Sequence, residues 1–220
     1  PLGRPDWDCA GAIFTNNVSS FEKMKLRMLN GAHSMLAYVG FHCGHRYVRD
    51  VMNDKMLSNL VNRHLQIAAQ TLKPIRGIDY NNYAKSLISR FSNPEIAHET
   101  FQIAMDGSEK MQQRIFYPLN DAINLNLNLR PFAFAIAAWL RHISQSYHDC
   151  EPYELRDPIA DQLSTLPKDK HAHSILEYLS RIGLLIDDLK DAEKFWEQVS
   201  DILNDMMSKP MKSIVEQEFI

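Results

Sequence analysis

The sequence predicts an all-α fold, and two observations support that prediction. Apolar residues recur at the spacing of one helix face through most of the chain, and no long stretch alternates with the period of two that a half-buried strand shows. Pro, Gly, Asp, Asn and Ser interrupt this pattern where helices are expected to start and end. Because no sequence repeats at a fixed period, we interpret residues 1–220 as a single helical domain.

The N-terminal part of the chain is expected to form an arm followed by a long helix. Residues 1–18 contain Pro, Gly, Trp and one short apolar run, which is typical of an extended segment and a turn. The helix is predicted to start at Ser19 and Ser20, because Ser19 and Glu22 fit the S-x-x-E capping box. Gly44 is a natural C-terminal cap for this helix.

Similar signals bound the helices that follow. Asp79 can cap a helix at 80–91, and Ser108 can cap one that runs towards residue 125. Pro131 lies in the first turn of a helix to about Tyr147, and the apolar block inside it predicts the most buried helix of the domain. Further helices are expected at 47–52, 54–72, 95–106, 171–182 and 191–207, and after residue 210.

Charge and cysteine content exclude several classes of function. The 24 basic and 27 acidic residues give a net charge of −3 without a sustained run of either sign, so neither a nucleic acid nor an anionic membrane is an expected partner. Cys9, Cys43 and Cys150 are few, odd in number and far apart, which favours free thiols in a reducing cytoplasm. No segment reaches the length of a membrane span or has the apolar region of a signal peptide.

The first long helix carries an unusual set of polar residues. At about 100° per residue, and with Lys25 as the origin, Glu22, His33 and Asn30 fall at about 60°, 80° and 140°. The same side also carries Leu26, Leu29 and Leu36, and the opposite side carries Arg27, Ser34 and Tyr38. Polar groups in an apolar stripe are costly to bury unless they satisfy one another or a ligand, so this face is a candidate site.

The spacing K-x4-N-x2-H suits the chemistry of an alcohol. It spans about 12 Å of one helix, so that Lys25, Asn30 and His33 could point into one cleft. A lysine in a water-poor cleft exchanges protons readily because desolvation disfavours its charged form. An asparagine can donate to a developing oxyanion, and a histidine can bond a neighbouring hydroxyl. On these residues alone, a structural role remains open, with Glu22 as a capping residue and the others as core residues.

Two other stretches are candidate sites. Between Arg90 and Arg114, breaks at 93–94 and 106–108 bring two helix ends and Lys110 together, which suits a polyol or a carboxylate but equally suits ordinary helix capping. The run 42–45 contains two histidines and a cysteine, but their directions diverge and no fourth ligand has zinc-type spacing, so we expect no metal. No glycine-rich nucleotide phosphate loop is present.

Three motifs carry a resemblance to a known family. KMKLRMLNGAHSMLAYVG, RFSNP and AMDGSEK resemble the C-terminal domain of the mannitol dehydrogenase and fructuronate reductase family, the polyol-specific long-chain dehydrogenases, from about Ala12 to about Arg114. This resemblance implies a multi-helical domain like the C-terminal domain of 6-phosphogluconate dehydrogenase. It also implies that an N-terminal Rossmann domain of the same polypeptide binds NAD, that no metal is needed, and that this chain is the second domain of a longer protein.

The resemblance also implies roles for individual residues. Lys25 would be the general acid and base, Asn30 part of the oxyanion environment, and His33 a ligand of a substrate hydroxyl. Glu22 would lie on the proton path, and Lys110 would contact the substrate.

A sixth position bears on the substrate. Gln102 stands where mannitol-oxidising members tend to have an arginine, and this departure favours the fructuronate reductases. The expected function is therefore NAD-dependent interconversion of D-mannonate and D-fructuronate, with a polyol and ketose reaction of the mannitol 2-dehydrogenase type as the alternative. A non-enzymatic helical interaction module, with Lys25 and His33 paired internally, is the second alternative. The isolated chain is expected to be inactive, because it lacks the element that holds the pyrophosphate of NAD.

Overall fold

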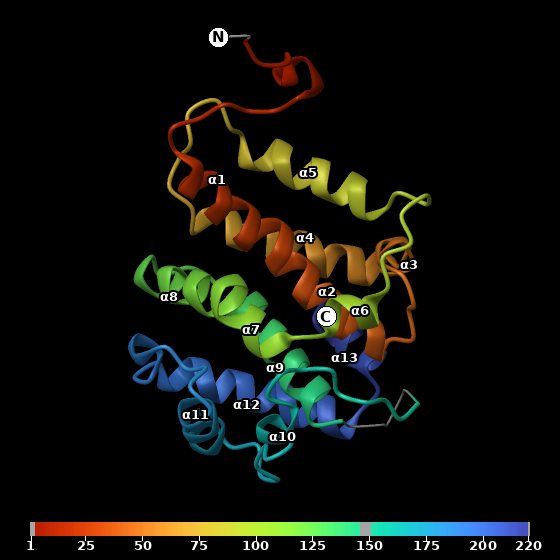
Figure 1. The fold of residues 1–220 in the computed structure, drawn as a ribbon. Coiled ribbons are helices and arrows are strands. Elements are labelled where there is room, and N and C mark those ends of the chain that lie inside the picture. Colours follow the sequence, from red (N-terminus) through yellow and green to blue (C-terminus); the bar gives the residue numbers. More distant parts are fainter. Residues whose placement is uncertain (1–2, 146–150, 220) are drawn as a thin grey trace.

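A computed structural model describes residues 3–145 and 151–219, which fold as an all-helical chain (Figure 1). Within these ranges no strand forms, and one isolated antiparallel bridge pairs Tyr47 with Glu99. The elements are η1 Trp7–Ala10, α1 Val18–Met24, η2 Lys25–Asn30, α2 Gly31–His42, α3 Val48–Asn53, α4 Lys55–Gln70, α5 Tyr80–Phe91, α6 Thr100–Ala104, α7 Gly107–Met111, η3 Gln112–Phe116, α8 Tyr117–Asn124, α9 Arg130–Ile143, α10 Ala160–Leu163, α11 Ala172–Arg181, η4 Asp187–Leu189, α12 Glu193–Ser208 and α13 Met211–Gln217.

The first long helix is one continuous rod made of α1, η2 and α2, and its middle part η2 is π-helical. Its end is as predicted: Gly44 has a φ of 82°, the Gly44 N–H donates to Phe41 O at 3.0 Å, and the His45 N–H donates to Gly40 O at 2.9 Å. In the view of Figure 1 the rod crosses the middle of the molecule, between α5 and the helix that contains α7 and α8.

The predicted start of that rod was wrong. Asn17 precedes the first helical residue, Val18, and the capping box of Ser19 and Glu22 does not form. Instead, the Ser20 hydroxyl donates to Asn17 Oδ1 at 2.8 Å. Ser19 and Ser20 therefore lie inside the first turn of the helix, and Ser20 bonds the side chain of the N-cap residue Asn17.

The core is organised around α9, as the apolar block predicted. Every residue from Pro131 to Ile143 is buried, and α9 packs against α2, α4 and α12. The side chains of Phe132 and Trp139 are fully inaccessible to solvent. Burying apolar side chains at about 25 cal/mol per Å² makes this helix a main source of stability. The helix ends at Ile143, with Ser144 as its C-cap, so the predicted end near Tyr147 was about four residues too late. Tyr147 itself and Cys150 lie outside the described residues.

The helix predicted at 95–106 was largely wrong, since only Thr100–Ala104 is helical. The preceding residues use their backbone groups elsewhere: the Val48 N–H donates to His98 O and the Thr100 N–H donates to Arg46 O, both at 2.9 Å. These long-range bonds hold the stretch extended. The prediction of Asp79 as the cap of α5 was right, because its carboxylate accepts from two backbone N–H groups of the first turn.

The helix predicted from Ser108 to residue 125 exists but differs in two ways. It starts one residue earlier, with Asp106 in the left-handed region at the N-cap position, so Ser108 is not the cap. A second π segment, η3, interrupts it between α7 and α8.

The arm formed by residues 3–16 extends beyond α5 in Figure 1 and is exposed along almost all of its length. It is not fully extended, because Trp7–Ala10 forms a short 3₁₀ turn in which Trp7 stacks on Phe14. Among the described residues, no helix has the length and apolar character needed to cross a membrane.

Candidate active site

The π segment η2 aligns the polar residues of the first helix. The Gly31 N–H donates to Leu26 O, five residues back, as in a π-helix. Residues five apart in such a segment lie over one another, just as residues three or four apart do in an α-helix. Lys25 therefore lies below Asn30, and Asn30 lies below His33, three residues further on.

Glu22 lies on the α-helical part, three residues before Lys25, and so shares its side of the helix. We call Glu22, Lys25, Asn30 and His33 the polar row. Regular α-helical winding would instead turn Asn30 about 140° away from Lys25. The π segment thus brings together the residues that the spacing K-x4-N-x2-H separates by five and three positions. On a regular helical wheel the four residues spread over one broad side of the helix, and the π-helical winding of η2 narrows that side.

The burial of this helix differs from the expected apolar stripe around the row. Glu22 and Lys25 are exposed, and Asn30 and His33 are half-buried. The opposite side, represented by Arg27, is buried with only 4% of its surface exposed. Helices α4, α6 and α9 pack around this rod, so its other side belongs to the core. The described residues therefore do not supply a water-poor cleft around Lys25.

His33 is the most enclosed member of the row. Its ring lies 4.4 Å from the ring of Phe91 and 6.2 Å from that of His98, measured between centroids. Burial lowers the pKa of His33 to about 4, with further lowering by His98, Arg114 and Arg90. Its Nε2 atom is buried and has no hydrogen-bond partner among the described residues. At neutral pH the ring is uncharged, and a hydroxyl group could satisfy this nitrogen.

The helix that contains α7, η3 and α8 runs antiparallel to the first helix. A Cβ atom added to Gly31 would lie 2.9 Å from Arg114 O, and one added to Gly107 would lie 2.7 Å from the Tyr38 hydroxyl. The guanidinium of Arg114 also donates to the Ser34 hydroxyl at 3.0 Å. The two π segments η2 and η3 are therefore in direct contact, next to the polar row.

Lys110 lies on α7 and not within the row. The antiparallel register places it beside the part of α2 that follows His33. Its Nζ donates to Met105 O at 2.6 Å and lies 3.5 Å from the Asp106 carboxylate. Asp106 itself has a φ of 53°, a strained value for a residue other than glycine.

The connection after α9 holds this end of α7 in place. The Asp157 carboxylate accepts from the Ser108 N–H at 2.9 Å and from the Ser108 hydroxyl at 2.5 Å. The Asp106 N–H donates to Arg156 O at 2.9 Å. Lys110 is thus carried on a helix start that is fixed by residues far along the chain.

Gln102 is exposed on α6, away from Lys25. Its neighbour Thr100 packs 3.5 Å from the position of a Cβ on Gly40. At 1.5 Å per residue, Gly40 lies roughly 20 Å along the helix from Lys25. Of the six predicted residues, Glu22, Lys25, Asn30 and His33 lie on the first helix, whereas Lys110 lies on α7 and Gln102 on α6.

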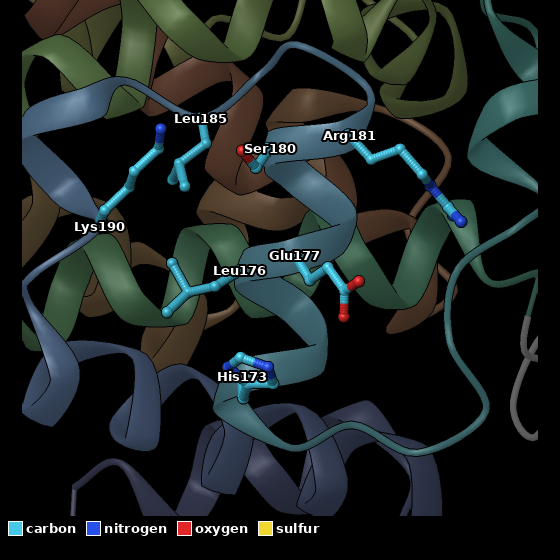
Figure 2. Close-up of a pocket in the computed structure, with 7 residues that line it drawn as sticks. All are labelled: His173, Leu176, Glu177, Ser180, Arg181, Leu185 and Lys190. Atoms are coloured by element: carbon cyan, nitrogen blue, oxygen red, sulfur yellow. The ribbon is translucent and has the colours of Figure 1, made fainter.

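One cavity borders the first member of the polar row. Glu22 lines a cavity of about 430 Å³ beside α8, together with Arg27 and Asp121. Figure 2 shows another cavity, of about 470 Å³, formed by α11 and the segment after it, and none of the predicted site residues lines it. In the part of the chain that the structure describes, no group of three or more His, Cys, Asp or Glu side chains is arranged to hold a metal.

Two arginines in this region were missed by the sequence analysis. Arg27 was assigned to the side away from the site, and Arg114 was treated only as the end of a motif. The available signal was the five-residue step from Lys25 to Asn30, which fits a π segment better than an α-helix. Such a segment needs support from its neighbours, and both arginines provide contacts there.

Comparisons with known proteins agree with this architecture. A family model described as the mannitol dehydrogenase C-terminal domain matches residues 17–207. D-mannonate oxidoreductase of Escherichia coli is 37% identical over 195 residues, which are 88% of this chain and 40% of the relative. Mannitol 2-dehydrogenase of Aspergillus oryzae is 33% identical over 208 residues, which are 93% of this chain and 41% of the relative.

A solved structure also matches. Mannitol 2-dehydrogenase of Pseudomonas fluorescens, in a ternary complex with NAD and D-mannitol, superimposes with a TM-score of 0.88 at 26% identity, over 98% of this chain and 44% of that one. The chain thus spans less than half the length of these relatives.

Proposed function

Because this chain belongs to the family of mannitol dehydrogenase C-terminal domains, we propose that it is the substrate-binding and catalytic domain of an NAD-dependent oxidoreductase. The reaction would interconvert a secondary alcohol and a ketone on a linear sugar acid or polyol. The observation that carries this proposal is the polar row, in which an exposed lysine, an amide and an uncharged imidazole follow one another along one helix.

The row supplies the acid–base part of that reaction. In reduction, the protonated amine of Lys25 gives its proton to the ketone oxygen; in oxidation, the neutral amine removes the proton of the alcohol. Asn30 donates an amide hydrogen to the same oxygen as negative charge develops on it. His33 bonds the neighbouring hydroxyl through its imidazole, and Glu22 passes protons between Lys25 and water.

The residues fit one wall of a site for NAD and substrate. When bound, the reduced cofactor NADH would supply hydride to the ketone carbon, and the oxidised cofactor NAD⁺ would take it from the alcohol carbon. The exposure of Lys25 and Glu22 leaves this face free for a second domain. Because the sequence has no glycine-rich phosphate loop, we assign the pyrophosphate site to an N-terminal Rossmann domain of the same polypeptide. The chain alone should not turn over substrate.

For the substrate, we propose the pair D-mannonate and D-fructuronate. A relative named D-mannonate oxidoreductase is among the more similar proteins. The family resemblance adds Gln102, which stands where mannitol-oxidising members tend to have an arginine. The ammonium of Lys110 would pair with the carboxylate of a sugar acid. A hexitol and ketohexose pair is the second candidate, because the matching solved structure is a mannitol 2-dehydrogenase.

A lysine substitution in the full-length protein tests the proposed role of the row. Lys25→Ala should abolish turnover while the Kd for NADH stays within about twofold of wild type, since the proton donor is lost and the nucleotide site is elsewhere. Lys23→Ala is the matched control, because Lys23 is also an exposed lysine at the start of the same helix. Near-normal kcat in Lys25→Ala would contradict the proposal.

The substrate is tested separately by comparing kcat/KM for fructuronate and fructose with the wild-type enzyme. A clear preference for fructuronate supports the sugar-acid reaction. A clear preference for fructose would transfer the assignment to the mannitol 2-dehydrogenase type.

A further inference from the structure

We propose that Arg27 is a positioning residue that holds the polar row in its productive line. Arg27 lies inside the π segment, two residues after Lys25 and three before Asn30. This inference rests on the proposed function of the row, because it assigns to Arg27 an effect on catalysis through the placement of Lys25 and Asn30.

The contacts of Arg27 tie η2 to two other helices. Its Nη1 donates to Thr71 O at 2.8 Å and to Thr71 Oγ1 at 3.0 Å. Thr71 is the C-cap residue of α4, and its own hydroxyl donates to Ala68 O at 2.7 Å. The Nη2 atom of Arg27 lies 2.6 Å from Asp121 Oδ2, on α8. One guanidinium therefore joins η2, the end of α4 and the middle of α8.

The guanidinium of Arg27 is a buried charge, and it is costly to bury unless its partners are in place. Arg27 is 4% exposed, so its charge is almost completely removed from water, whereas Asp121 is 43% exposed at the edge of two cavities. The carbonyl groups at the end of α4 carry partial negative charge and complete the environment of the guanidinium. A lysine keeps the charge but cannot reproduce the planar fork that reaches Thr71 and Asp121 together.

Arg27 affects the polar row by stabilising the π-helical winding of η2. π-helical turns are rare and short because their hydrogen bonding is less favourable than that of an α-helix, so neighbouring contacts must hold them. At the far end of the segment, Gly31 lies against Arg114 O, and the absent Cβ permits that approach. Near its beginning, the bond from Arg27 to Asp121 provides the second attachment to the same neighbouring helix. If the segment relaxed to α-helical winding, Asn30 would turn away from Lys25.

The test compares two arginine substitutions in the full-length enzyme. Arg27→Lys removes the fork, and Arg130→Lys is the matched control. Arg130 also makes a forked ion pair with a buried carboxylate, that of Glu218, at 2.5 Å, but it lies at the start of α9. For each variant we would measure the melting temperature, the Kd for NADH, kcat, and the primary deuterium isotope effect on kcat with NADH deuterated at the transferred position.

Both variants should lower the melting temperature, Arg27→Lys by more, because Arg27 is 4% exposed and Arg130 is 37% exposed. Arg27→Lys should in addition lower kcat by about tenfold or more and raise the isotope effect, because a misplaced proton donor slows the chemical step. Arg130→Lys should leave kcat within about twofold of wild type, since its contacts are away from the row. Asp121→Asn, at a half-exposed position, should show a smaller loss of kcat and a rise in the isotope effect, and it decides the question if Arg27→Lys does not fold.

The inference is overturned if kcat and the isotope effect of both Arg27→Lys and Asp121→Asn change no more than those of Arg130→Lys. Lys25→Ala in the same series separates this failure from a failure of the proposed function. If Lys25→Ala abolishes turnover and the arginine variant does not, only the role of Arg27 is lost. If Lys25→Ala keeps near-normal kcat, the proposed function and the positioning role are lost together.

Discussion

Replacing Gly31 with alanine probes the contact between the two π segments. Gly31 follows Asn30 directly and faces the neighbouring helix. An added Cβ would lie 2.9 Å from Arg114 O and 3.3 Å from His64 Nε2. The first of these atoms belongs to the backbone of a packed helix. Reaching an ordinary contact distance of 3.4 Å therefore requires the two helices to separate by about half an ångström at that point.

Two opposing effects set the magnitude. Alanine is favoured over glycine inside a helix by about 1 kcal/mol. Overpacking of a closely packed contact costs about 1–3 kcal/mol. We therefore expect Gly31→Ala to lower the free energy of unfolding by about 1 kcal/mol, which corresponds to a fall in Tm of about 2–4 °C for a domain of this size. Displacement of Asn30 should lower kcat by about tenfold in addition.

The assay is thermal unfolding of the full-length protein together with steady-state kinetics. Ser86→Ala on the exposed side of α5 is the control, because an exposed helical position should change stability by less than about 0.5 kcal/mol. The reasoning is refuted if Gly31→Ala raises Tm, since that outcome would mean that helix propensity dominates and that no close contact limits this position.

Two further predictions concern Lys110 and His33. Asp157→Asn should raise KM for the sugar substrate several-fold with little change in kcat, because weaker bonds to Ser108 loosen the helix start that carries Lys110. An unchanged KM in steady-state kinetics would show that Asp157 does not hold Lys110 in place for substrate binding. Burial lowers the pKa of His33 from 6.5 to about 4 in the folded chain. Between about pH 6.5 and pH 4 the unfolded chain therefore binds a proton at this residue that the folded chain does not bind. The free energy of unfolding consequently falls as the pH is lowered through that window. In urea unfolding, His33→Asn should lose roughly 2 kcal/mol less than wild type between pH 7 and pH 4.5, and parallel pH curves for the two proteins would contradict the assignment.

Local sequence signals predicted those parts of the fold that local chemistry controls. Asp79 caps α5 because its carboxylate accepts from the N–H groups of Asn81 and Asn82, and this depends on a few neighbouring residues only. Gly44 ends the first helix because glycine enters the left-handed region without strain. The apolar block of α9 has no polar side, so no arrangement other than burial suits it.

The parts that were mispredicted depend on residues distant in sequence. A regular helical wheel puts Arg27 on a side away from the site and gives no reason to bury it. Its burial follows from Thr71 and Asp121, which lie 44 and 94 positions further along the chain. The extended stretch before α6 likewise depends on bonds to residues around Tyr47. No propensity of the local residues reveals such partners.

The polar row shows how the two kinds of information combine. Family resemblance selected Lys25, Asn30 and His33 without stating how residues separated by five and three positions could act together. A π segment makes the five-residue step roughly equivalent to one turn, which is how Lys25 and Asn30 could act on the same substrate oxygen. That winding is maintained by core contacts on the buried side of the same helix, while Lys25 remains exposed on the other side. The core therefore supports the side of the helix opposite the row, and, if Lys25 acts as proposed, water must be excluded from it by a surface outside the described residues.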